Sequence, residues 1–175
     1  DPVEGRIGGL LAAHNEGFEQ LESDLDALAF EFAGVANAAH RAGFGLDGAS
    51  GRELFEVPAG GPDGAARALR VSADVAGRPD LLGVAGSAAE VPGGNGALRA
   101  LGALQDQPLP GVGEPPGQAL AQASARFSGQ IASARAEADV SGAALNHLEA
   151  VEASATGVSL EEEMLAMNET QNALQ

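Results

Sequence analysis

The stretch GFGLDG, residues 43–48, has the glycine spacing G-x-G-x-x-G that dinucleotide-binding turns use to approach a pyrophosphate. Such a turn works when a strand precedes it and a helix follows, because the helix N-terminus then faces the phosphates. Here the sequence pattern places a long helix before the turn and a loop after it. We therefore expect a helix cap and a turn, with Gly43 as the left-handed residue after the helix and Gly45, Asp47 and Gly48 in the turn.

Other residue types that could carry chemistry do not group into a site. Asp47, Ser50 and Glu53 lack the alternating acidic spacing of a calcium loop, because Ala49 and Gly51 occupy the intervening ligand positions. The three histidines are isolated from one another and are expected at surface or half-buried positions: His14, His40 and His147. None of them pairs with another histidine one helical turn away, as a helical zinc motif requires.

The composition removes further mechanisms. The chain has no Cys, and all nine of its basic residues are Arg. Without Lys there is no P-loop lysine and no Schiff base, and without Cys there is no thiolate nucleophile or ligand. No G-x-S-x-G sequence surrounds any serine. The sequence therefore predicts no catalytic residue, no metal site and no cofactor, and favours a protein that is not an enzyme.

The charge balance of the chain limits which partners it can bind. The chain carries 25 acidic residues and a formal net charge of −16 over 175 residues. Such a surface repels nucleic-acid phosphates and anionic lipid head groups, so neither nucleic acid nor a membrane is an expected partner. The apolar runs also fall short of the roughly 20 residues that a membrane span needs.

An apolar pattern with alternating spacings of three and four residues predicts a long first helix that ends near Ala42. The pattern suggests that the helix begins near Ile7. The acidic residues between the apolar positions, Asp26 among them, are expected on a solvated face. The expected packing seam of this helix consists of Phe18, Leu21, Leu25, Leu28, Phe32 and Val35.

The middle of the chain, residues 43–94, reads as loops with short extended pieces. Residues 53–57 and 68–72 alternate enough to form two strands, and the GGPDG sequence between them predicts a small hairpin. Residues 79–82 are expected to begin a helical turn. Asn95 is expected to cap a short helix that runs to Asp106, and the PLPGVGEPPG sequence at 108–117 is expected to form a helix-breaking linker.

A second long helix is expected over residues 118–155, ended by Gly157. Its seam is weaker, because its middle positions are Ala and Ser, and we expect the core to use Phe127, Ile131, Leu145 and Leu148. A capping box, with Ser159 as the N-cap and Glu162 three residues later, is expected to open a last helix.

Together these elements predict a mainly α fold, an elongated antiparallel bundle of long helices with a small β-hairpin and loop region inserted. Three parts are expected along the chain. Residues 1–42 form the long N-terminal helix of the rod domain, and residues 43–94 form the loop-rich region. Residues 95–175 contribute the short helix, the linker and the C-terminal helices that pack back on the rod. The two seams are expected to lie mainly in an intramolecular core.

Four stretches occur in the order in which they occur in the family of flagellar hook-associated protein 1, the hook–filament junction protein. They are GRIGGLL at 5–11, NAAHRAGFGLDGASGRELF at 37–55, NGALRALGALQD at 95–106 and GVSLEEEM at 157–164. The chain resembles this family over most of residues 5–57 and 95–175. It departs from the family's pattern near the end, where Thr170 and Leu174 stand at positions that are usually aromatic.

The resemblance implies a structural subunit of the bacterial flagellum, outside the cell, that forms the junction between hook and filament. It implies export by the flagellar type III secretion apparatus without a cleaved signal peptide. The implied partners are other copies of the protein in a homo-oligomeric layer, the hook protein and the second junction protein. An export chaperone would bind the C-terminal segment. Against the family's length, this chain is expected to be a fragment without the two terminal helical segments.

A second function class stays open on the residues alone. A heptad seam of this kind also suits a soluble helical adaptor, or a module like an export chaperone, that binds partner helices in a groove. Apolar heptads at both ends of the complete gene product would favour the junction subunit over the adaptor.

Overall fold

The computed structural model describes residues 17–156 and 160–173, and their fold is mainly helical. They fall into two compact units, divided between Ile131 and Ala132. The first unit begins with helix α2 (Glu19–Arg41), which ends one residue before the expected limit. Acidic residues in its first turn and Arg41 in its last turn match the polarity of the helix dipole. The expected start near Ile7 lies outside the described residues.

The expected hairpin is confirmed as a two-stranded antiparallel sheet. Strand β1 (Phe55–Glu56) pairs with β2 (Arg70–Val71), with Phe55 opposite Val71 and Glu56 opposite Arg70. The connection is longer than a simple turn, because the short helix α3 (Ala65–Ala68) lies within it. Ala68 therefore belongs to a helix, where the sequence pattern placed it in a strand.

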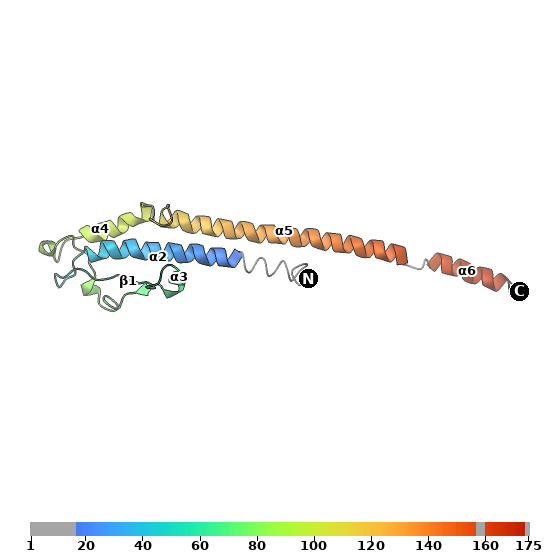
Figure 1. Ribbon diagram of the computed structural model, residues 1–175, viewed down its shortest axis with the longest axis horizontal. Helices are drawn as coiled ribbons and strands as arrows, with labels where there is room; N and C mark the ends of the chain where they lie inside the picture. The colour runs from blue at the N-terminus through green and yellow to red at the C-terminus, as the bar shows by residue number, and fades with distance from the viewer. Residues whose placement is uncertain (1–16, 157–159, 174–175) are drawn as a thin grey trace. The chain divides into compact units, whose positions relative to one another are not determined.

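Several short helices follow the sheet. The expected helical turn at residues 79–82 is the 3-10 helix η2 (Pro79–Leu81), and η3 (Ala88–Glu90) follows it. The expected short helix is α4 (Gly96–Ala103), continued by η4 (Leu104–Asp106). In Figure 1, α4 lies on one side of α2, and β1 and α3 lie on its other side.

The N-terminus of α4 is not capped as the sequence predicted. The Asn95 side chain makes no capping hydrogen bond. The carbonyl of Val84 instead accepts the backbone N–H groups of Ala97 and Leu98, at 3.1 and 3.2 Å. A loop distant in the sequence thus satisfies donors that every helix leaves free in its first turn.

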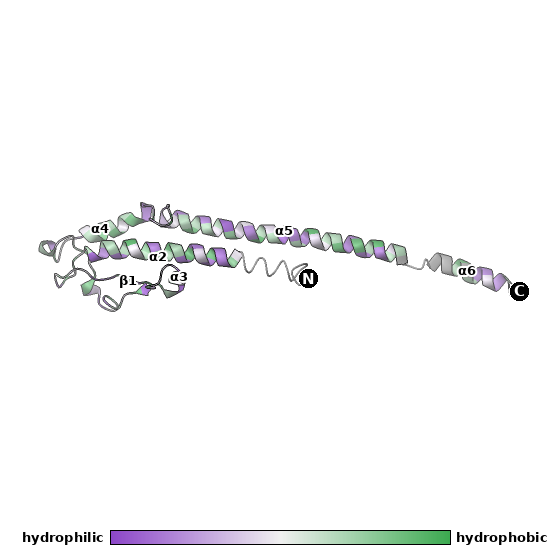
Figure 2. Cartoon of the chain, in the orientation of Figure 1, coloured by the Kyte–Doolittle hydropathy of each residue, from purple (hydrophilic) through white to green (hydrophobic). Residues whose placement is uncertain are grey.

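Helix α5 (Pro116–Thr156) is 41 residues long and extends slightly beyond the expected range at both ends. Helix α6 (Leu160–Ala173) is the last element. Figure 2 shows the apolar residues of α5 as bands that recur along the helix, separated by polar residues. The expected roles of Gly157, Ser159 and Glu162 at the junction before α6 fall outside what the structure describes.

Candidate assembly surface and the contacts that position it

The GFGLDG stretch forms a turn whose glycines serve different purposes. Gly48 has a φ of 72°, so it needs the left-handed region that glycine enters freely. Gly43 does not have a positive φ, which corrects the expected helix cap. Instead, a Cβ at Gly43 would lie 2.4 Å from the Gly83 carbonyl oxygen and 2.7 Å from the Ala97 Cβ. Close approach of two backbone segments therefore requires glycine at this position.

Asp47 stabilises the turn from within. Its Oδ1 accepts the Ala49 backbone N–H at 3.1 Å, and the carboxylate forms an ion pair with Arg52. The Arg52 guanidinium lowers the pKa of Asp47 below its ordinary value, with the Ala49 hydrogen bond adding to the effect. No helix begins within residues 44–54, so the turn does not lead into a helix N-terminus as a dinucleotide-binding turn does. The arrangement is that of a structural turn.

Three polar side chains on α2, here called the anchor residues, are buried against the loop-rich segment: Asp26, Asn37 and His40. They share one face of the helix with the fully buried Ala33 and Ala36. The small alanines let other segments approach α2 closely, which brings the three polar groups within hydrogen-bonding distance of backbone atoms. The anchor residues therefore fix residues 52–83 on α2.

Asp26 and Asn37 each hold a segment far along the chain. Asp26 Oδ2 accepts the Gly64 N–H at 2.7 Å and Oδ1 accepts the Ala66 N–H at 2.9 Å, which satisfies the N-terminus of α3. Asn37 Oδ1 accepts the N–H groups of Leu54 and Phe55, at 2.9 and 2.8 Å, and its Nδ2 donates to the Phe55 carbonyl at 2.9 Å. Asn37 thereby holds the chain at the start of β1.

His40 is 2% exposed and connects two loops. The Gly83 backbone N–H donates to its Nε2 at 2.9 Å, so Nε2 carries no proton. The proton is therefore on Nδ1, which lies 2.8 Å from the Arg52 carbonyl and donates to it. A neutral imidazole in this tautomer has both ring nitrogens satisfied.

Sequence reasoning missed the anchor residues. It placed Asp26 on a solvated face, and it expected His40 at the surface or half-buried. Asp26 can be buried because two N–H groups of the α3 turn donate to its carboxylate in place of water. His40 can be buried because two backbone groups form hydrogen bonds with its ring nitrogens. The available signal was spacing: Asp26, Asn37 and His40 fall on the face that also carries Ala33 and Ala36.

The expected seam of α2 lies mostly beside the anchor face. Leu21 and Leu25 line a groove together with Ala66 and Arg67 of α3. The Phe32 ring packs against Phe55, with ring centroids 6.0 Å apart. The α2 seam is half-buried along its length except for Phe18, which is 52% exposed; its other members are Leu21, Leu25, Leu28, Phe32 and Val35.

Helix α2 also meets the first turns of α5 within the first unit. The rings of Phe18 and Phe127 contact each other edge to face at 5.2 Å. Arg126 reaches Asp24 across the helices at 2.7 Å. Phe18 and Phe127 thus pair as members of the two expected seams, while Ile131, the next seam position on α5, is 38% exposed.

Beyond Ile131 the side chains of α5 are almost all exposed. Among residues 132–155 only Ala134 is half-buried. Leu145 and Leu148 are 57% and 63% exposed, which differs from the core position expected for them. This stretch of α5 presents four large apolar side chains, here called the α5 apolar residues: Val140, Leu145, Leu148 and Val151.

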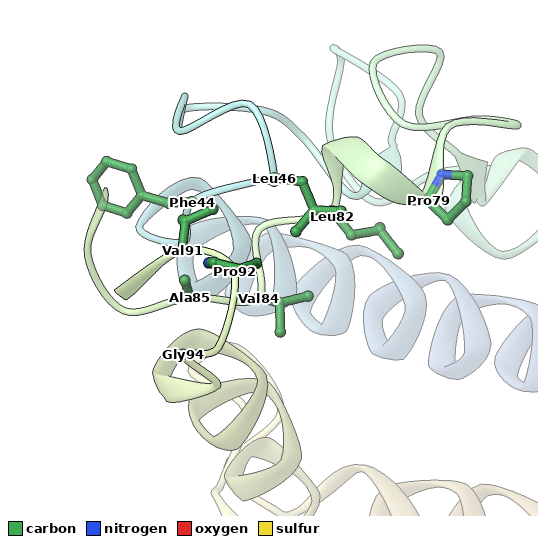
Figure 3. A pocket seen from close by; sticks show the side chains of 9 residues that line it. All are labelled: Phe44, Leu46, Pro79, Leu82, Val84, Ala85, Val91, Pro92 and Gly94. Carbon is green, nitrogen blue, oxygen red and sulfur yellow. The ribbon is translucent and has the colours of Figure 1, made fainter. Parts of the chain in front are cut away.

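An apolar cavity of about 170 Å³ lies where the turn at Phe44 and Leu46 meets residues 79–85 and 91–94. Figure 3 shows its lining, which consists of aliphatic, proline, glycine and phenylalanine residues. Such a cavity can receive an apolar group, but its lining offers no side chain that could act as an acid, a base or a nucleophile.

The described residues contain no group of three or more His, Asp or Glu side chains placed to hold a metal ion. His147 is exposed on α5, and His14 lies outside the described residues. No described helix combines the length and apolar character that a bilayer crossing requires.

The fold and contacts define a helical structural module, in which one helix carries a small loop-and-sheet region and a second long helix presents apolar side chains. Residues 1–55 match the family model of the flagellar hook-associated protein FlgK helical domain. The resemblance to hook-associated protein 1 is thus confirmed over these residues, which include α2, the turn and the anchor residues on α2. The match implies a flagellar hook-associated structural protein.

No curated protein and no solved structure matches the chain. The stretches at 95–106 and 157–164 lie beyond the matched residues, so their resemblance to the family stays a prediction.

Proposed function

We propose that the chain is part of a subunit that forms the junction between the hook and the filament of a bacterial flagellum, by side-by-side packing of long helices. The observation that carries the proposal is the match of residues 1–55 to the FlgK helical domain. The subunit acts outside the cell after export through the flagellar type III apparatus. Its partners are further copies of itself, the hook protein and the second junction protein, with an export chaperone before assembly.

The α5 apolar residues support an assembly role. Burying a Val or Leu side chain completely contributes about 1.5–3 kcal/mol, so four such side chains left in water represent a sizeable gain that assembly can recover. The acidic surface favours partners other than nucleic acid or anionic lipid. Side-by-side packing of helices in a layer of subunits covers such residues.

Electron microscopy of cells that lack the gene encoding this chain tests the proposal. We expect hooks without filaments, and filament protein shed into the medium, because the filament has no base on which to assemble. Restoring the gene should restore the filaments. Normal filaments in the deleted strain would contradict the junction role and favour the helical adaptor.

A further inference from the structure

Asn95 and Gly96 form an exposed pair at the start of α4. Asn95 stands at the N-cap position, yet its side chain makes no hydrogen bond to any described residue. The carbonyl of Val84 accepts the N–H groups of Ala97 and Leu98, so the first turn does not depend on the asparagine amide. The side chain of Asn95 is therefore free to react.

An asparagine that precedes a glycine can lose its side-chain amide without an enzyme. The backbone nitrogen of the glycine gives up its proton to solvent and attacks the asparagine Cγ. A new C–N bond forms, the amide nitrogen leaves as ammonia, and a five-membered succinimide ring closes. Glycine favours this step because it has no Cβ to restrict the backbone. Water then opens the ring at either carbonyl carbon, which gives aspartate or isoaspartate.

The N–H that would attack is free at Gly96 and bonded in the comparable pairs of the chain. Aspartate precedes glycine in two further pairs, Asp47-Gly48 and Asp63-Gly64. The glycine N–H of the first donates to a carbonyl within its turn at 2.9 Å, and that of the second donates to Asp26 at 2.7 Å. The first N–H groups of a helix have no partner within it, and no described residue accepts that of Gly96.

The other described asparagines are held in place. Asn37 makes three hydrogen bonds to the backbone at the start of β1. Asn146 lies within α5, and Asn168 and Asn172 lie within α6. In an α-helix the N–H of the following residue donates to a carbonyl one turn earlier, so the helix would have to open before that nitrogen could attack. Asn95 therefore differs from all four.

We propose that Asn95 is a site of spontaneous deamidation, and that its isoaspartate product loosens the start of α4. The ψ of Asn95 is 22°, so the peptide that joins it to Gly96 must turn before the glycine nitrogen reaches Cγ. That rotation requires the first turn of α4 to open, as helix ends do more readily than helix centres. The rate of deamidation therefore depends on how often this turn opens.

The two products act differently on the fold. Aspartate is a good N-cap residue, and its charge is favoured at the positive end of the helix dipole. Isoaspartate adds a methylene to the main chain between Gly94 and Gly96, where the backbone is tightly packed. A Cβ on Gly94 would lie 2.6 Å from the Glu90 Cβ, and one on Gly96 would lie 3.1 Å from the Gly86 Cα. Isoaspartate therefore displaces the start of α4 from the carbonyl of Val84.

Peptide mapping by mass spectrometry, on the whole chain incubated at about pH 8 for several weeks, tests the reaction. A sample that is digested without incubation corrects for conversion during digestion. We expect Asn95 to convert at least about tenfold faster than Asn146, and to do so faster as the pH is raised, because the attacking nitrogen must lose a proton. Conversion of Asn95 that is no faster than that of Asn146 would overturn the proposal.

Two matched variants assign the reaction to this side chain. Glutamine has one more methylene, so its ring would have six members and closes far more slowly. Asn95→Gln should therefore abolish the gain in mass in the peptide that contains this position. Asn146→Gln, at an exposed position of α5, should leave that gain unchanged. An unchanged gain in mass in Asn95→Gln would overturn the proposal, because a different group would then be reacting.

Amide hydrogen exchange tests the effect of isoaspartate on α4. The isoaspartate form, separated from the incubated chain by chromatography, should lose at least about tenfold in protection at Ala97 and Leu98. Protection in the centre of α2, near Ala33, should stay the same. Asn95→Asp, which lacks the added methylene, should keep the protection of the unaltered chain. Equal protection of Ala97 and Leu98 in the isoaspartate form and in Asn95→Asp would overturn the proposed loosening.

Discussion

At the scale of single residues, Asn37 satisfies three backbone groups at the start of β1. Leucine has a similar size but can satisfy none of them, and each buried group left unpaired costs about 1–3 kcal/mol. We expect Asn37→Leu to lower the free energy of unfolding by at least 2 kcal/mol, measured by urea denaturation. Asn146→Leu makes the same change at an exposed position of α5 and should shift it by about 0.5 kcal/mol or less. Equal effects of the two substitutions would contradict the anchoring role.

Replacing glycine by alanine should have opposite effects on stability at two positions near each other in the sequence. Gly43→Ala would push a methyl group against the Gly83 backbone, so we expect a loss of about 1–3 kcal/mol in unfolding free energy. At Gly34, in the interior of α2, an added Cβ meets nothing within 4 Å. Gly34→Ala should stabilise the chain by about 0.5–1 kcal/mol, because alanine favours the helix. Thermal melting followed by circular dichroism compares the two, and a stable Gly43→Ala variant would show that the contact can relax.

At the scale of elements, α2 and the exposed part of α5 differ in what their leucines do. Leu28 is half-buried on α2, so Leu28→Asp places a charge in a partly desolvated site and should lower the unfolding free energy by about 2 kcal/mol or more. Leu148→Asp, at a side chain that is 63% exposed, should leave the melting temperature of the isolated chain nearly unchanged. Under the proposed function, Leu148→Asp should still impair filament formation in cells. Melting curves and motility assays separate the two effects, and normal motility of the Leu148→Asp strain would argue against α5 as the assembly surface.

The elements themselves could largely be predicted from the sequence, because each depends on local signals. The spacing of apolar residues predicts α2 and α5, and the GGPDG sequence predicts the hairpin. The anchor contacts could not be predicted, because Asp26 and His40 bond to backbone groups 38 to 43 residues away. Gly43 illustrates the same limit: glycine at a helix end ordinarily indicates a left-handed cap, but here a segment 40 residues further along the chain requires it. In the same way, Val84 rather than Asn95 satisfies the start of α4.

At the scale of the whole chain, electrostatic repulsion should dominate the response to salt. Six ion pairs between described residues engage Arg41, Arg52, Arg67, Arg70, Arg78 and Arg126, yet the net charge is −16. Salt at about 1 M screens charges beyond about 3 Å, which weakens long-range repulsion more than it weakens contact pairs. We expect the melting temperature to rise by several degrees between about 0.05 and 1 M NaCl. This is a shift on the order of 1 kcal/mol.

A variant with fewer charges provides the control for that experiment. Glu137→Gln, Asp139→Asn and Glu149→Gln together remove three negative charges from exposed positions of α5. The combined variant should respond less to salt than the unaltered chain does. A melting temperature that falls as salt is added would show that the ion pairs outweigh the repulsion.

The way in which α2 holds the loop-rich segment also bears on how this protein can change over evolutionary time. Asp26, Asn37 and His40 all bind main-chain atoms of residues 52–83, and every amino acid except proline offers those same donors and acceptors. Gly64, with a φ of 76°, and Gly83, where a Cβ would lie 2.6 Å from the His40 carbonyl oxygen, are exceptions that need glycine. Elsewhere in the bound segment, substitutions can accumulate while the three residues of α2 stay the same. We therefore expect most positions of the loops to tolerate substitution, and the three positions of the helix to tolerate little.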